Sequence, residues 1–281
     1  MNKNTPLMKA CKRRYYKSST KHHDIEELLK ENPGDLNTQN RDGTTALMFA
    51  CGSNIHKGGC PDIEIVKILL NQTNCNVNLQ NNDGMTALMF AIANYDCDII
   101  NLFLEDKRCK FDLQAYSGTA FIHACRFSAL DVVKLLIQSN KFDINARSKK
   151  SGANALLSSL IHPSQEPISK LLIENEDCDL NIKTYNGWDL LYTACFQNRE
   201  NIVKMILKLS PKRYTVDGSL KYSNYQHLID DYFDKERNRI AVLIMSVKKS
   251  KNENPLKILP KEMIHLIISY SHPFSKQTKY L

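Results

Sequence analysis

One short segment recurs along this 281-residue chain and limits its fold more than any other feature. Residues 45–51 read Thr-Ala-Leu-Met-Phe-Ala-Cys, residues 86–91 repeat the first six letters, and residues 119–125 repeat the pattern more loosely. Such self-similarity indicates one supersecondary unit stacked on copies of itself. The chain is therefore predicted to be a repeat solenoid, an architecture that more often offers a binding surface than a catalytic pocket.

The repeat can be followed by one polar anchor residue in each copy. The anchors are Thr5, Thr45, Thr86, Thr119, Asn154 and Asp189, and they define repeats one to six. The spacings between them are 40, 41, 33, 35 and 35 residues. The two long spacings require insertions, which we place at residues 13–23 and 52–61. Insertions in solenoids map to loops on one face.

Each anchor is predicted to cap a short helix. Thr, Asn and Asp side chains accept a hydrogen bond from the free N–H groups of a helix's first turn. Pro6 follows Thr5 at the first helical position, where proline is favoured. Asp-Gly and similar pairs before the anchors are typical of tight turns, and in repeat four the glycine, Gly118, lies one place later.

A second helix is predicted in every repeat. Apolar residues recur at three- and four-residue spacing, which is typical of an amphipathic helix with one buried face. Related tails such as Asp-Leu-Asn then end the repeats, at residues 35–37, 76–78, 143–145 and 179–181. The predicted second helices span residues 25–29, 62–70, 99–104, 131–137, 168–173 and 202–209.

A turn, a capped helix, a second helix and this tail together resemble the ankyrin repeat. The resemblance covers residues 1–217 as six repeats and implies an all-α ankyrin-repeat solenoid, with a turn and two antiparallel helices in each repeat. One column departs from the family, whose Thr-Pro-Leu-His box has a histidine there. We expect the residues that replace this histidine to compensate by packing in the core. They are Met8, Met48, Met89, Ile122, Leu157 and Tyr192.

The family resemblance implies that a protein target binds the concave face, which is formed by the turn tips and the solvent side of the first helices. Aromatic residues concentrate there in repeats four to six, and exposed aromatics and arginines are typical interface anchors. The alternative is that some of them, above all Phe127 and Phe196, are buried between repeats. The register assigns to this face Arg41, Asp42, Thr44, Asn82, Asp83, Met85, Tyr116, Arg126, Phe127, Lys150, Tyr185, Trp188 and Phe196.

The repeat pattern fades after Pro211. Residues 218–250 are predicted to form a helical cap or degenerate repeat, since the terminal repeats of a solenoid need a polar outer face. Residues 251–281 are predicted to be a linker and one further helix. Pro260 suits the first turn of that helix, and Glu262 lies near the positive end of its dipole.

This last helix resembles the opening of an F-box. That resemblance implies docking on the adaptor subunit of cullin–RING ubiquitin ligases through Leu259, Pro260, Met263, Ile264 and Ile267. Ankyrin proteins of poxviruses and giant viruses of amoebae are similar, with repeats first and a truncated F-box-like end. Such an origin would place the chain in the host cytoplasm. The alternative is a simple binding scaffold or competitive inhibitor, whose last helix only caps the stack.

Charge argues against nucleic acid as the partner. Residues 1–30 hold eight Lys or Arg against three acids, residues 245–281 hold seven against two, and the remainder is nearly neutral. A nucleic-acid site needs a basic stripe along the whole face. The basic, aromatic insertion at residues 13–23 either contacts an anionic partner or is a solvated loop. No membrane segment is expected, because the apolar run at residues 240–247 is too short.

Most of the nine cysteines follow the repeat register, which predicts small buried core residues. One column holds Cys11, Cys51, Cys125 and Cys195, and another holds Cys75, Cys109 and Cys178. Free buried thiols favour a reducing compartment and hence the cytoplasm.

We expect no metal, cofactor or enzyme activity. Cys60 and Cys97 lie outside the two cysteine columns. Cys51, His56 and Cys60 lack the fourth ligand of a structural zinc site. The sequence has no phosphate-binding glycine motif, nucleophile elbow or His-Glu-x-x-His motif.

Overall fold

A computed structural model describes residues 4–12, 20–53, 61–209 and 227. It divides into two compact parts, residues 1–190 and 191–281. The first part holds repeats one to five and the turn of repeat six. The predicted cap at 218–250, apart from residue 227, and the F-box-like segment at 251–281 lie outside the described residues.

Each of the six repeats contributes a pair of helices, as predicted. The first helices are α1 (Pro6–Lys12), α3 (Ala46–Ala50), α5 (Ala87–Ala93), α7 (Ala120–Phe127), α9 (Ala155–Ser159) and α11 (Leu190–Phe196). The second helices are α2 (Thr20–Glu31), α4 (Ile63–Leu70), α6 (Cys97–Glu105), α8 (Leu130–Gln138), α10 (Glu166–Glu174) and α12 (Glu200–Ile206). Short 3-10 turns, η1 (Pro33–Asn37) and η3 (Pro163–Gln165), complete the helical elements of this region.

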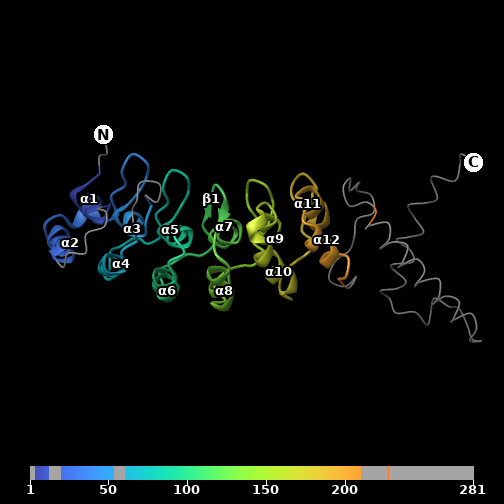
Figure 1. The fold of residues 1–281 in the computed structure, drawn as a ribbon. Helices are drawn as coiled ribbons and strands as arrows, with labels where there is room; N and C mark the ends of the chain where they lie inside the picture. The colour runs from blue at the N-terminus through green and yellow to red at the C-terminus, as the bar shows by residue number, and fades with distance from the viewer. Residues whose placement is uncertain (1–3, 13–19, 54–60, 210–226, 228–281) are drawn as a thin grey trace, which may run out of the picture. The chain divides into compact units, whose positions relative to one another are not determined.

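Within residues 1–190 the helices form two rows (Figure 1). The first helices follow one another from α1 to α9, and each packs on the next. The second helices form the other row, and the turns project beyond the first helices. The core lies between the rows, where the apolar face of each second helix meets its first helix.

The predicted helix caps are confirmed in five repeats. The side-chain oxygen of the anchor accepts a hydrogen bond from the backbone N–H three residues later, at 3.0–3.3 Å. A cap of this kind stabilises a helix by about 1 kcal/mol. The five capping residues are Thr5, Thr45, Thr86, Thr119 and Asn154.

Repeat four adds a small element of sheet to the predicted all-α fold. β1 (Gln114–Ala115) pairs antiparallel with β2 (Gly118–Thr119), so that Gln114 faces Thr119 and Ala115 faces Gly118. The turn has one residue fewer than in repeats two, three and six and two fewer than in repeat five, which is why its glycine lies next to the anchor. The deletion leaves a two-residue hairpin loop, Tyr116-Ser117.

The first insertion is shorter than predicted. We expected residues 13–23 to form a loop, but α2 begins at Thr20, so the last four residues of that range belong to the helix. The first turn of α2 therefore includes residues that the apolar pattern did not mark. His23 lies on this helix and contacts Glu27 at 3.1 Å, one turn later.

The apolar replacements in the histidine column pack in the core, as predicted. Met8, Met48, Met89, Ile122 and Leu157 are all buried, whereas Tyr192 is only partly buried. The loss of the family's histidine is thus matched by apolar contact in repeats one to five.

The cysteine columns are mostly buried. The whole first column, together with Cys75 and Cys178, is buried, and burial raises the pKa of the Cys51 and Cys125 thiols. Cys109 is a correction, because it is partly exposed, although desolvation still raises its thiol pKa to about 12. These thiols are therefore protonated at neutral pH and behave as small apolar residues.

The tail asparagines join successive repeats. The side-chain amide of Asn78 donates to the carbonyl of Arg108 at 2.7 Å, and its oxygen accepts from the backbone N–H of Lys110 at 2.8 Å. Asn37 and Asn145 make the same pair of bonds to the next tail, at 2.7–2.8 Å. The sequence showed the recurring tail, but its role as a link between repeats became visible only in the structure.

Repeat three has Asp112 in this column, and a carboxylate has no N–H to donate. By analogy with Asn78, Asp112→Asn would donate to the carbonyl of Lys141 and accept from the N–H of Asp143. We expect it to raise the free energy of unfolding by about 1 kcal/mol, and the melting temperature by about 2–4 °C. Thermal melts would check this. The exposed Asp177→Asn, with the same charge change, is the control, and equal or opposite shifts would contradict the link.

Candidate protein-binding surface

The turn tips form a row of exposed side chains, and backbone hydrogen bonds join each turn to a neighbour. Neighbouring turns are joined by hydrogen bonds from the N–H of Asn82 to the carbonyl of Asp42 and from the N–H of Tyr116 to the carbonyl of Asp83, both 3.0 Å. The N–H of Tyr185 donates to the carbonyl of Ser151 at 2.9 Å. Seven predicted residues are exposed there: Arg41, Asp42, Asn82, Asp83, Tyr116, Lys150 and Tyr185.

A second column of side chains supports these turns. The amide of Gln80 donates both to the carbonyl of Gly84 in its own turn, at 2.6 Å, and to the carbonyl of Gln114 in the next repeat, at 3.0 Å. Gln39 makes the equivalent pair, and Gln114 donates to the carbonyl of Arg147 at 2.8 Å. Arg147 ends the series with bonds to the carbonyls of Gly152 and Lys183.

We did not predict this Gln/Arg column. It lies two residues after the tail asparagine in each repeat, so the register could have found it. Because the bonds are already formed in the free chain, the backbone of the turn tips loses little conformational freedom when a partner binds.

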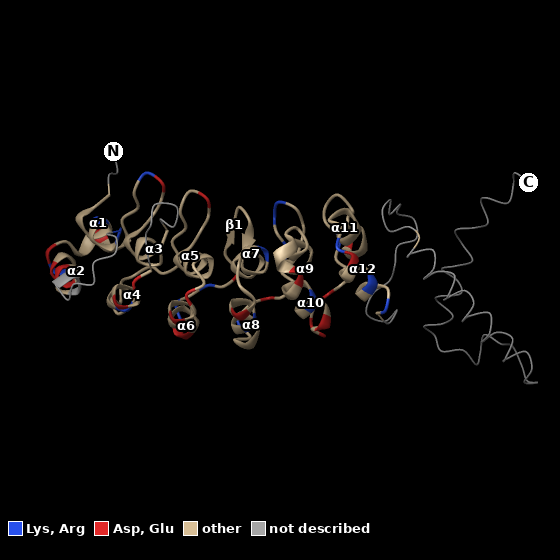
Figure 2. Cartoon of the chain, viewed as in Figure 1, with Lys and Arg blue, Asp and Glu red and all other residues tan. Residues whose placement is uncertain are grey.

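The turn tips change character along the row (Figure 2). The turn of repeat two presents Arg41 and Asp42, that of repeat three presents Asp83, and the turn before α9 presents Lys149 and Lys150. The ammonium of Lys150 lies 3.5 Å from the centre of the Tyr116 ring and donates a short hydrogen bond to its hydroxyl. That contact lowers the pKa of the Tyr116 hydroxyl.

The end of α7 carries a second group of aromatic and cationic side chains. Phe127 is 39% exposed, and its ring centre lies 5.0 Å from that of His123 and 5.9 Å from that of His162. The guanidinium of Arg126 lies 4.9 Å from the same ring centre. The hydroxyl of Tyr95, from the preceding repeat, donates to the carbonyl of Phe127 at 2.9 Å.

Two polar atoms in this group are buried without a hydrogen-bond partner: Nδ1 of His123 and Nε of Arg126. Burial, and then the nearby charge of Arg126, lower the pKa of His123 to about 4. The imidazole is therefore neutral at physiological pH. Buried polar atoms are nearly always hydrogen-bonded in folded proteins, so two unpartnered atoms in one place require an explanation.

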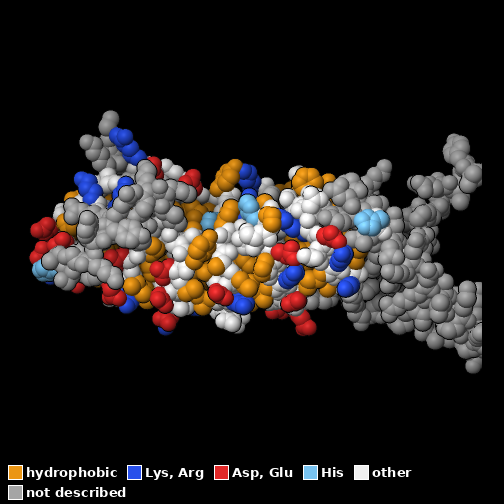
Figure 3. All heavy atoms as spheres, viewed as in Figure 1, with side chains coloured by type: hydrophobic (Ala, Val, Ile, Leu, Met, Phe, Trp, Pro, Cys, Tyr) orange, Lys and Arg blue, Asp and Glu red, His pale blue; other side chains and the backbone are white. Residues whose placement is uncertain are grey.

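We call the set Tyr95, Tyr116, Arg126, Phe127, Lys150 and Tyr185 the aromatic–basic surface. In Figure 3, hydrophobic and basic side chains at the turn tips and histidine side chains over α7 and α9 are visible on one face. Tyr95, His162 and Lys149 were missed from the sequence. His162 occupies the same column as Phe127, so its place was available from the register.

The structure places the remaining predicted residues differently. Thr44 is only 7% exposed, so its side chain is not available to a partner. Met85 and Trp188 are partly buried. Phe196 lies in the second part of the chain, is exposed, and stacks on Tyr192 with ring centres 6.4 Å apart. Leu259, Pro260, Met263, Ile264 and Ile267 lie outside the described residues.

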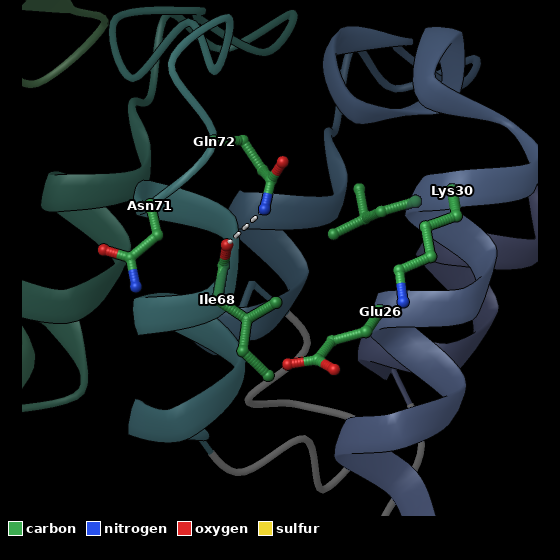
Figure 4. A pocket seen from close by; sticks show the side chains of 6 residues that line it. Glu26, Lys30, Ile68, Asn71 and Gln72 are labelled. Atoms are coloured by element: carbon green, nitrogen blue, oxygen red, sulfur yellow. Dashed lines mark hydrogen bonds between the residues drawn. The ribbon is translucent and has the colours of Figure 1, made fainter.

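An open hollow lies between α2 and α4 and is lined by six residues (Figure 4). The amide of Gln72 is directed to the carbonyl of Ile68, at 3.2 Å, and the other polar groups are those of Glu26, Lys30 and Asn71. This lining has no nucleophile paired with a base.

Among the described residues, no group of three or more His, Cys, Asp or Glu side chains is arranged to hold a metal ion, and His56 and Cys60 lie outside these residues. Within the same ranges, no helix combines the length and the apolar character needed to cross a membrane.

Comparisons with known proteins agree with the geometry. Residues 57–148 match the family model described as ankyrin repeats (3 copies). A solved chain titled "Bd0816 Predatory Endopeptidase from Bdellovibrio bacteriovorus in complex with immunity protein Bd3460" is 26% identical, with a TM-score of 0.55, over 72% of this chain and 97% of its own. The crystal structure of EF0377, an ankyrin repeat protein, is 24% identical, with a TM-score of 0.60, over 75% and 100% of the two chains.

No curated protein sequence matches the chain. The matched family model nevertheless covers repeats three and four with their neighbouring segments, and the solved chains extend the likeness over most of the described residues. The pairs of capped helices, the turns and the linked tails are therefore ankyrin repeats, and the fold of this chain is an all-α ankyrin-repeat solenoid.

Proposed function

We propose that this chain is a non-enzymatic binding protein that holds a protein partner on the aromatic–basic surface. One observation carries the proposal. Among the described residues, five large hydrophobic side chains are exposed, and four of them belong to this surface: Tyr116 (72%), Tyr185 (64%), Tyr95 (52%) and Phe127. Exposed apolar groups gathered in one place mark interaction sites, and Tyr and Arg are enriched among interface hot spots.

The comparisons support this proposal at the level of the fold. Ankyrin repeats generally mediate protein–protein interaction and are not catalytic modules. One of the similar solved chains comes from a complex between an endopeptidase and an immunity protein. Buried free thiols also support a reducing compartment, and we include a cytoplasmic location in the proposal.

Affinity capture tests the proposal. The tagged full chain would be incubated with cell lysate beside the double variant Tyr116→Ser/Phe127→Ser, and the captured proteins would be quantified by mass spectrometry. We expect the double variant to lose at least about 90% of the specific partner, since single hot spots contribute 2 kcal/mol or more. The control is Lys107→Ala/Lys134→Ala, which changes two exposed residues outside the surface. Equal capture by all three proteins would contradict the proposal.

We also propose that the F-box-like segment docks the adaptor subunit of a cullin–RING ubiquitin ligase. The support is the sequence itself, with Leu259-Pro260 followed by Glu262 and by Met263, Ile264 and Ile267. The similarity to viral ankyrin proteins with a truncated F-box-like end points the same way. In this account the repeats recruit a substrate to the ligase.

A single charge placed among the apolar residues of this segment tests the proposed docking. Leu259→Asp in the full chain is expected to abolish capture of the purified adaptor subunit, because a buried charge in an apolar interface is strongly unfavourable. Lys257→Asp, outside the apolar positions, is the control and should retain capture. Equal capture of the adaptor by wild type and Leu259→Asp would favour the alternative, a simple binding scaffold. In that case, deletion of residues 255–281 should lower the melting temperature but leave partner capture intact.

A further inference from the structure

The two cations of the aromatic–basic surface, Arg126 and Lys150, lie over aromatic rings, and neither forms an ion pair with Asp or Glu in the described ranges. Lys67 and Lys170, by contrast, each contact a glutamate of their own helix at 2.8 Å. The surface thus presents positive charge that the fold does not neutralise.

One of these cations also has a buried donor with no acceptor. Nε of Arg126 carries an N–H that can only donate, and it is buried without a hydrogen-bond partner. Nδ1 of His123 has no partner either, and positions 123 and 126 lie on the same side of α7. The Nε–H of Arg126 needs an acceptor, and a carboxylate is the strongest acceptor for a guanidinium; Arg126 as a whole is only partly buried and can therefore meet one on a partner.

The remaining charges of the row favour the same partner. Asp83 lies at the turn tip of repeat three, and Asp42 stands beside Arg41 at the tip of repeat two, so an acidic ligand is favoured most near Lys149 and Lys150. The eight residues of α7 span about 12 Å. An extended segment needs at least about four residues to run the length of α7 alone.

We propose that the partner presents an extended acidic segment to the aromatic–basic surface. One Asp or Glu of that segment accepts hydrogen bonds from the exposed part of the Arg126 guanidinium, a second lies near Lys150, and an apolar residue between them packs on Phe127. This inference rests on the proposed function and adds the chemistry of the partner to it.

A random 12-residue peptide library displayed on phage, selected against the full chain, tests the inference. We expect the enriched peptides to carry two or more Asp or Glu residues beside an apolar residue. The best synthetic peptide, measured by fluorescence anisotropy, should bind Arg126→Gln and Lys150→Gln about tenfold more weakly than wild type. Arg126→Lys keeps the charge but lacks Nε–H, and it should also bind more weakly. Lys67→Gln is the control with the same loss of charge and should bind like wild type.

The peptide itself supplies the second half of a double-mutant cycle. Replacing its Asp or Glu by Asn or Gln should weaken binding to wild type but add little to the loss in Arg126→Gln. Enrichment of neutral or basic peptides, no enrichment at all, or binding unchanged in Arg126→Gln would overturn the inference. If such peptides still lose binding to Phe127→Ser, the proposed function stands and only the acidic chemistry is wrong. Binding insensitive to both substitutions would contradict the proposed function as well.

Discussion

Gly84→Ala is expected to lower the free energy of unfolding by about 3 kcal/mol. Gly84 has φ +77°, a conformation that costs an L-residue roughly 1–2 kcal/mol. A Cβ at this position would also lie 2.9 Å from Cα of Ala115 and 3.1 Å from the carbonyl oxygen of Gln114. These are backbone atoms of the next repeat, so the two turns must move apart, and the bonds from Gln80 to both of them weaken.

Gly187→Ala is the matched control for this prediction. Gly187 has φ +80°, but a Cβ there would meet nothing within 4 Å. The Gly187→Ala variant therefore has the backbone strain without the close contact, and it should lower the free energy of unfolding by only about 1 kcal/mol. Urea denaturation of both variants measures the difference. Equal losses of unfolding free energy in the two variants would show that the close approach of Gly84 to the next repeat does not add to the cost of its substitution.

The second large effect concerns the response to acid. Lowering the pH from 7 to 4.5 is expected to destabilise the fold by about 2.5 kcal/mol through His123 alone. Burial, and then the charge of Arg126, hold the pKa of His123 at about 4, against an ordinary value of 6.5. Between these values the unfolded chain binds a proton that the folded chain does not. Stability is therefore retained above pH 6.5 and falls as the pH drops toward 4.

His123→Leu tests this expectation. The leucine should remove most of the pH dependence between 7 and 4.5, because the side chain is 9% exposed and packs beside Phe127. His162→Leu, at an exposed neighbouring histidine, should leave the dependence as in wild type. Thermal melts at half-unit intervals would measure it, and an unchanged slope in His123→Leu would refute the assignment.

A carboxylate responds in a separate pH range. Hydrogen bonds from Arg108 lower the pKa of Asp106, so its contribution is present above its ordinary pKa and is lost only as the pH falls below about 4. Arg108 also donates to the carbonyls of Leu70 and Gln72 at the end of α4, which links repeats two and three. The contribution of Asp106 is therefore lost mainly below the window from pH 7 to 4.5.

The sequence predicted features that depend on neighbours along the chain. The five anchor caps and the two helices of each repeat follow from local periodicity, and the buried methionines follow from their column. The hairpin of repeat four was visible only as a displaced glycine, because its strand pairing depends on a missing residue. The first turn of α2 was missed because its polar residues carry no apolar pattern.

The binding surface was harder to predict because it depends on contacts between repeats. The register correctly gave exposed positions at Tyr116 and Tyr185, but it also included Thr44, whose side chain is buried. Tyr95 was missed because it follows α5, outside the turn-tip column, and reaches Phe127 only through stacking of repeats three and four. The two unpartnered buried atoms of His123 and Arg126 have no signature in sequence.

The central claim is that the partner covers the aromatic–basic surface, and lysine footprinting tests it most directly. The captured complex and the free chain would be acetylated briefly, and each lysine would be quantified by mass spectrometry. Lys149 and Lys150 lie at the turn tips, whereas Lys134 and Lys170 lie on the second helices. We predict that the partner protects Lys149 and Lys150 and leaves Lys134 and Lys170 as reactive as in the free chain. Protection of Lys134 and Lys170, with Lys149 and Lys150 unchanged, would contradict the account.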